Sequence, residues 1–122
     1  MTLIVATSKT PEFLYDVQKG IFQMKGRSIP ENPKPFYGQI SDILQQYLKN
    51  PANKTVFTFQ LEYLNSTSVN GLNALLQLLN KLHQSGKEVS IQWLYEEGDD
   101  DMQEMGSRLQ ERVAFSFKIS KG

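Results

Sequence analysis

Three consecutive hydroxyl side chains, Ser66, Thr67 and Ser68, follow Asn65 directly after residues 55–63, which alternate between apolar and polar types. A helical pattern of apolar residues begins just after them, so the hydroxyls stand at a predicted helix start. Backbone N–H groups at a helix start have no partner within the helix, and the positive end of the helix dipole lies there. A phosphate added to one of these hydroxyls would therefore be stabilised by its surroundings.

The same cluster also has a purely structural interpretation. A hydroxyl at this position can cap the helix by accepting a hydrogen bond from an amide of the first turn, which stabilises the helix by about 1 kcal/mol. We predict that Ser68 is this helix cap. A capping box would place Glu or Gln three residues after the cap, but Asn and Gly stand there, so no carboxylate competes for the free amides.

A third interpretation makes Ser66 the nucleophile of a hydrolase. A serine nucleophile needs a nearby base, and the chain has no cysteine, one distant histidine and no Gly-x-Ser-x-Gly elbow. We therefore expect a protein that is not an enzyme.

The composition limits the classes of protein and partner that fit this chain. A length of 122 residues, 39% of them hydrophobic, suits one domain over residues 1–122 with its core at about 11–119. The 13 basic residues balance the 13 acidic ones without forming a basic run, so nucleic acid is not an expected partner. Without cysteine and with one histidine, the sequence predicts neither a metal site nor a cofactor.

The hydropathy pattern indicates where in the cell the protein is expected. No stretch approaches about 18 consecutive apolar residues, so we expect no membrane span. The apolar start at residues 1–6 lacks the basic segment and the long apolar stretch of a secretion signal. The expected location is the cytoplasm.

The first third of the chain predicts two strands and a helix. Residues 13–16 and 21–24 are β-prone runs joined through Lys19-Gly20, which is typical of a hairpin, and we expect the domain to begin with it. Residues 26–35 contain three prolines and a glycine and are predicted to be an irregular loop. Apolar residues at three- and four-residue intervals predict a helix over 36–48.

The remaining elements indicate how the sheet is covered. Residues 55–63 and 88–95 alternate between apolar and polar, and a helical pattern over 69–82 separates them, which predicts parallel strands. Their polar outer faces predict helices on one face of a mixed sheet. A third helix at about 101–112 and an edge strand at 115–119 complete the α/β prediction. The side chains predicted to point inward from the first of these strands are Phe57, Phe59, Leu61 and Tyr63.

Three segments in register resemble those of the SiaC family of bacterial regulatory phosphoproteins. They are residues 26–32, residues 61–68 and residues 92–97, the last followed by an acidic turn and Asp101-Met102. Their order and spacing match from about Pro11 to Phe117. The resemblance implies a STAS-like fold, of the anti-sigma-factor-antagonist type, with a mixed sheet backed by helices.

The resemblance also implies a function. In this family the Thr or Ser directly after the Asn at the helix start is phosphorylated by a dedicated Ser/Thr kinase and dephosphorylated by a PP2C-type phosphatase. The unphosphorylated protein binds and activates a GGDEF-type diguanylate cyclase, which links it to cyclic-di-GMP and biofilm formation. By position the phosphoacceptor is Ser66. The commoner pattern resembles Asn-Thr-Ser-Ser, whereas here Ser comes first, so Thr67 is the second candidate.

Two further side chains are candidate contacts of a partner or of the phosphate. Arg27 lies in a stiff loop, where it is either part of a stabilised turn or a group whose guanidinium can bind phosphate oxygens through two hydrogen bonds. Asn65 precedes the hydroxyl cluster directly. The sequence thus predicts a non-enzymatic phosphorylation switch, with a constitutive interaction scaffold as the alternative.

Overall fold

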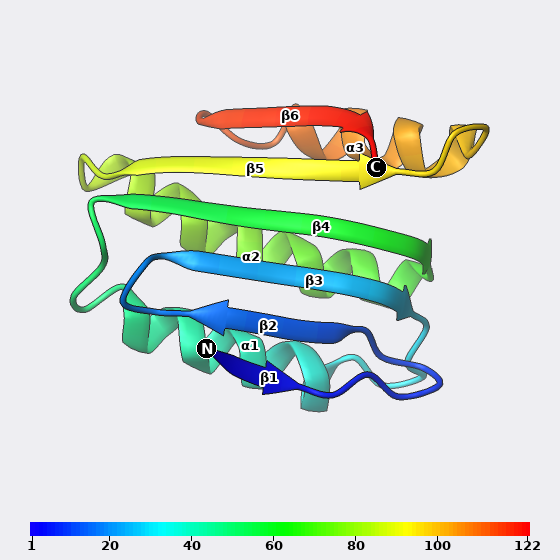
Figure 1. Ribbon diagram of the computed structural model, residues 1–122, viewed down its shortest axis with the longest axis horizontal. Helices are drawn as coiled ribbons and strands as arrows, with labels where there is room; N and C mark the ends of the chain where they lie inside the picture. The colour runs from blue at the N-terminus through cyan, green and yellow to red at the C-terminus, as the bar shows by residue number, and fades with distance from the viewer.

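A mixed sheet forms one layer of the structure and three helices form the other (Figure 1), in a computed structural model that describes residues 1–122. In chain order the elements are β1 (Thr2–Ile4), β2 (Glu12–Asp16), β3 (Ile21–Ser28), α1 (Lys34–Tyr47), β4 (Lys54–Leu64), α2 (Ser66–Gln84), β5 (Glu88–Tyr95), α3 (Asp100–Gln110) and β6 (Ser116–Lys121). The six strands lie in the sheet in the order of the sequence. Strands β1 to β3 are antiparallel, and β3 to β6 are parallel.

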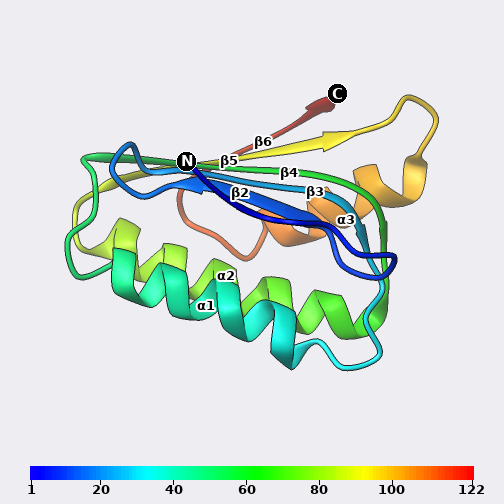
Figure 2. The same ribbon diagram turned by 60° about the horizontal axis from the view of Figure 1, so that its bottom comes forward.

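All three helices lie on the same face of the sheet (Figure 2), as the one-sided strands predict. Phe57 and Phe59 of β4 are fully or almost fully buried beneath the helices, whereas Thr58 and Gln60, which alternate with them, lie on the open face and are half-buried. The mixed sheet with helices on one face is therefore confirmed. None of the helices is both long and apolar enough to cross a membrane.

The start of the sheet differs from the prediction in one respect. The hairpin of β2 and β3 is confirmed, and Gly20 in its turn has a φ of 68°, which favours glycine. The sheet does not begin with this hairpin, however, because β1 precedes it and pairs antiparallel with β2. Three residues are too short a run for alternation to reveal a strand.

The predicted loop at 26–35 is also shorter than expected, because β3 continues to Ser28. Gly26 allows this continuation with a φ of 122°, a conformation that strains residues with a Cβ atom. The strand register shifts here: Gly26 pairs with Leu61 and Arg27 with Tyr63, so Glu62 has no partner in β3. This arrangement is a β-bulge.

The bulge corrects the prediction that Tyr63 points inward. One extra residue in β4 reverses the alternation of its side chains beyond Leu61. Leu61 is buried, whereas Tyr63 is 61% exposed.

Helix α3 packs against β5 through a tryptophan. The Trp93 side chain is buried, and its Nε1 donates a hydrogen bond of 2.8 Å to the carbonyl oxygen of Met102. The indole occupies the space beside Gly106, where an added Cβ would lie 2.5 Å from Trp93 Cδ1. Asp99 caps this helix by accepting a hydrogen bond from the Met102 amide at 3.2 Å.

We expect Gly106→Ala to lower the free energy of unfolding by about 1–3 kcal/mol, because the methyl group overpacks the indole. Gly38→Ala is the matched control, since Gly38 is an exposed glycine of α1 with no atom within 4 Å of an added Cβ. There alanine should stabilise the protein by up to about 1 kcal/mol. Urea denaturation measures both, and a Gly106→Ala protein as stable as the unchanged chain would contradict this packing.

Candidate functional site

The site lies where β4 ends and α2 begins. Asn65 is the N-cap of α2, with φ −84° and ψ 169°, and its Oδ1 accepts a hydrogen bond of 3.0 Å from the Ser68 amide. The helix therefore starts at Ser66, and the prediction of Ser68 as the cap is wrong. Asparagine is among the best N-cap residues, and its short side chain reaches the third amide of the helix.

Ser68 instead belongs to a row of buried hydroxyls that joins β3, α1 and α2. The Ser28 hydroxyl lies 2.5 Å from the Tyr37 hydroxyl and 2.8 Å from that of Ser68. The Ser68 hydroxyl also lies 2.7 Å from Asn65 Oδ1 and 2.9 Å from the Ser28 carbonyl oxygen, both of which can only accept. Because each hydroxyl has one proton and the Ser68 proton is donated to these acceptors, the row can run in only one direction. The Tyr37 hydroxyl donates to Ser28, and the Ser28 hydroxyl donates to Ser68.

The protonation state of the Tyr37 phenol agrees with its role as the donor at the start of this row. Burial raises the pKa of the Tyr37 phenol above its usual value, although the hydrogen bond with Ser28 opposes the shift. The phenol therefore remains neutral and can donate throughout the physiological pH range.

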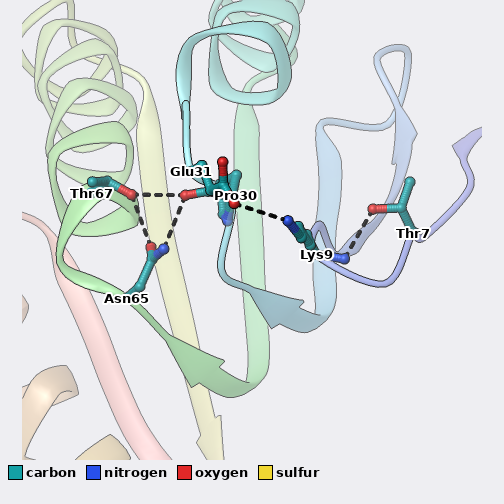
Figure 3. A network of polar contacts seen from close by, with 6 residues as sticks. All are labelled: Thr7, Lys9, Pro30, Glu31, Asn65 and Thr67. Carbon is teal, nitrogen blue, oxygen red and sulfur yellow. Dashed lines mark hydrogen bonds and ion pairs between the residues drawn. The ribbon is translucent and has the colours of Figure 1, made fainter.

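A second set of hydrogen bonds fastens the loop after β3 to the start of α2 (Figure 3). The Pro30 carbonyl oxygen accepts from Asn65 Nδ2 at 3.0 Å and from Thr67 Oγ1 at 3.1 Å. The loop is held from its other side by Lys9, whose Nζ lies 3.3 Å from Glu31 Oε1 and whose carbonyl oxygen accepts from the Ile29 amide at 2.8 Å. The start of α2 is thus supported by segments that are far apart in the sequence.

The three hydroxyls of the cluster consequently have different surroundings. Ser66 is exposed, and its hydroxyl makes no hydrogen bond within the chain. Thr67 is half-buried and bonded to Pro30 and to Asn65 Oδ1, each at 3.1 Å. Ser68 is completely buried. The first turn of α2 contains no acidic residue, so its positive end is uncompensated by the chain itself.

Of the two candidate contact residues, Asn65 is fully engaged within the chain, whereas Arg27 is largely exposed. Both polar groups of the Asn65 side chain are engaged within the chain, as the helix cap and as the donor to Pro30. Arg27 projects from the end of β3, where its Nε lies 3.7 Å from Glu62 Oε2 and its side chain is 64% exposed. It makes no hydrogen bond or ion pair with residues 65–68.

Sequence reasoning missed three supporting residues: Ser28, Pro30 and Tyr37. Ser28 and Pro30 fall in the loop predicted over 26–35, and Tyr37 falls in the helix predicted over 36–48, with nothing in either pattern to mark them as part of the site. Their contacts join residues 9 to 40 positions apart, so no local pattern marks them. What the arrangement provides chemically is one accessible hydroxyl, on Ser66, held on a firmly supported helix start.

Comparison with known proteins identifies relatives over almost the whole chain. The family model described as "SiaC family regulatory phosphoprotein" matches residues 4–122. An uncharacterized protein of Pseudomonas aeruginosa strain UCBPP-PA14 is 32% identical over 116 residues, which cover 95% of this chain and 92% of the relative.

Solved structures agree with the sequence match. Crystalline apo-SiaC from Pseudomonas aeruginosa superposes with a TM-score of 0.89 at 31% identity, covering 98% of this chain and 99% of that one. The complex of diguanylate cyclase SiaD with its activator SiaC, from the same species, gives a TM-score of 0.93 at 30% identity with both chains fully covered. With a family match and a shared fold over nearly its full length, this chain belongs to the SiaC family of regulatory phosphoproteins.

Proposed function

We propose that this chain is a single-domain, non-enzymatic phosphoprotein of the cytoplasm, in which phosphorylation of Ser66 prevents binding to a diguanylate cyclase. The unphosphorylated form binds and activates the cyclase, a Ser/Thr kinase adds the phosphate and a PP2C-type phosphatase removes it. The observation that carries the proposal is the exposed, unbonded hydroxyl of Ser66 at the start of α2. The related SiaC, solved in complex with the cyclase SiaD as its activator, supports the choice of partner.

Accessibility favours Ser66 over its neighbours as the phosphoacceptor. A kinase must bring the acceptor oxygen into its own active site, which requires an exposed hydroxyl. Phosphorylation of Thr67 would first break its hydrogen bond to Pro30, and phosphorylation of Ser68 would place a charged group in the core. Thr67 therefore remains the second candidate.

The energetics allow the phosphate to block binding without unfolding the protein. A phosphate carries about −1.5 to −2 charges, and the positive end of α2 stabilises such a group by about 1 kcal/mol. Burying the same unpaired charge against a partner costs several kcal/mol, and each 1.4 kcal/mol is about tenfold in affinity. The fold should therefore persist while the complex dissociates.

Co-expression with the Ser/Thr kinase of the proposed switch should add one phosphoryl group to this chain. We expect Ser66→Ala to abolish the added mass and Thr67→Val to retain it, because only the Ser66 hydroxyl is free. Intact-mass spectrometry with fragmentation locates the group. Loss of the phosphate in Thr67→Val but not in Ser66→Ala would reverse this assignment, and an unchanged mass of the parent chain would count against the switch.

Phosphorylated protein should bind the partner diguanylate cyclase at least about a hundredfold more weakly than unphosphorylated protein, which corresponds to about 2.7 kcal/mol. Isothermal titration calorimetry measures the affinities, and synthesis of cyclic-di-GMP measures activation. Ser66→Ala is the control: it should bind like the unphosphorylated chain and be unaffected by the kinase. If both phospho-forms bind equally tightly, the protein is a constitutive scaffold.

A further inference from the structure

Tyr37 is a buried side chain of α1 that reaches the start of α2. Both helices begin at the same end of the sheet (Figure 2), and the Tyr37 ring packs so closely against Gly71 of α2 that an added Cβ there would overlap the ring carbons. The Tyr37 hydroxyl begins the buried row that continues through Ser28 to Ser68. This side chain therefore joins α1 and β3 to the turn of α2 that carries the proposed phosphoacceptor.

The polar groups of this row are all satisfied within the chain. Ser28 and Ser68 are completely buried and Tyr37 almost completely, and no buried side-chain nitrogen or oxygen lacks a hydrogen-bond partner. The Ser28 carbonyl oxygen adds two further bonds, because it accepts from the Asn65 amide at 3.0 Å and from the Ser68 hydroxyl at 2.9 Å. A buried network that is fully satisfied rigidifies its surroundings and favours one arrangement over others. The row therefore holds the first turn of α2 against β3 and α1.

The row acts differently on the three hydroxyls at residues 66–68. Ser68 is its last member, and Asn65 Oδ1 accepts from both the Ser68 and the Thr67 hydroxyls, at 2.7 Å and 3.1 Å. Bringing the Thr67 hydroxyl into the active site of a kinase requires the first turn of α2 to open, and every hydrogen bond that holds this turn opposes the opening. Ser66 needs no such opening, because its hydroxyl is exposed and has no partner within the chain.

We propose that the buried row of Tyr37, Ser28 and Ser68 selects the phosphoacceptor, with Tyr37 as a specificity-determining positioning residue that keeps the Thr67 hydroxyl inaccessible to the kinase. The inference rests on the proposed function and adds the reason why one of three adjacent hydroxyls is modified. Because Tyr37 is buried, it acts through Ser28 and Ser68 and not by contact with the kinase. Loss of one hydrogen bond shifts an opening equilibrium by about fivefold, which sets the size of the expected effect.

The test measures the rate at which the Ser/Thr kinase of the proposed switch modifies Thr67 when Ser66 no longer competes. In the Ser66→Ala background, Tyr37→Phe leaves the ring seated against Gly71 but removes the donor at the start of the row. We expect this second change to raise the initial rate of Thr67 phosphorylation about fivefold. Ser28→Ala, which breaks the row at its middle, should raise it by at least as much. Fragmentation mass spectrometry locates and quantifies the phosphate.

Tyr47→Phe is the matched control in the same background. Tyr47 is a second buried tyrosine of α1, as little exposed as Tyr37, and its hydroxyl lies 2.7 Å from that of Thr55 near the opposite end of the helix. Its loss removes a comparable hydrogen bond without touching the start of α2, so the Thr67 rate should not change. Hydrogen exchange of the Ser68 amide, which does not depend on the kinase, should quicken about fivefold in Tyr37→Phe and stay unchanged in Tyr47→Phe. Urea denaturation checks that the variants fold.

The outcomes distinguish failure of this inference from failure of the proposed function. If Tyr37→Phe and Ser28→Ala leave the Thr67 rate unchanged, the row does not select the acceptor, and the switch at Ser66 stands. An equal rise in Tyr47→Phe also overturns the inference, because lower overall stability then accounts for the rise. If the unchanged chain accepts no phosphate, the proposed function fails and the inference with it.

Discussion

Asn65 uses one side chain to start α2 and to hold the loop that follows β3. Its carbonyl oxygen caps the helix through the Ser68 amide, and its amide nitrogen donates to Pro30. The Ser68 hydroxyl bonds to the same oxygen and continues inward to Ser28 and Tyr37. The position of every hydroxyl in the cluster depends on this cap, because it fixes which residue of the cluster faces the core and which faces solvent.

This arrangement gives the three consecutive hydroxyls different structural surroundings. Ser68 is satisfied in the interior, Thr67 fastens the loop, and Ser66 is left exposed. A charge gained at Ser66 is stabilised by the helix dipole and disturbs no hydrogen bond of the frame. In the proposed switch, the phosphate is therefore carried by the residue of the cluster that contributes least to the fold.

The sheet contributes a second surface feature through its one irregularity. Regular alternation would place Tyr63 on the helix-covered face of β4 with Phe59 and Leu61, but the unpaired Glu62 directs Tyr63 into solvent near the end of the strand. Gly26 permits the distortion in the neighbouring strand through its positive φ. The bulge thus exposes the aromatic ring of Tyr63, and the Asn65 cap leaves the Ser66 hydroxyl accessible, both at the same end of β4.

The sequence by itself determined the regular elements and the side of the sheet that the helices cover. Apolar residues at helical spacing predicted the three helices, and the alternating pattern at 55–63 and 88–95 predicted strands with one polar face, because both periodicities are set by local backbone geometry. The cluster at 66–68 was likewise visible as a helix start. Strand β1 was missed, since three residues carry too little pattern.

Only the tertiary structure decided the details of the helix start and of the bulge. Whether Asn65 or Ser68 caps α2 was settled with contacts to Ser28 and Pro30, which lie at least 35 residues away in the sequence. The outward direction of Tyr63 was decided by a register shift against β3, and alternation within one strand cannot reveal the register of its neighbour. Periodicity describes one segment at a time, whereas caps, bulges and buried hydrogen bonds are properties of segments in contact.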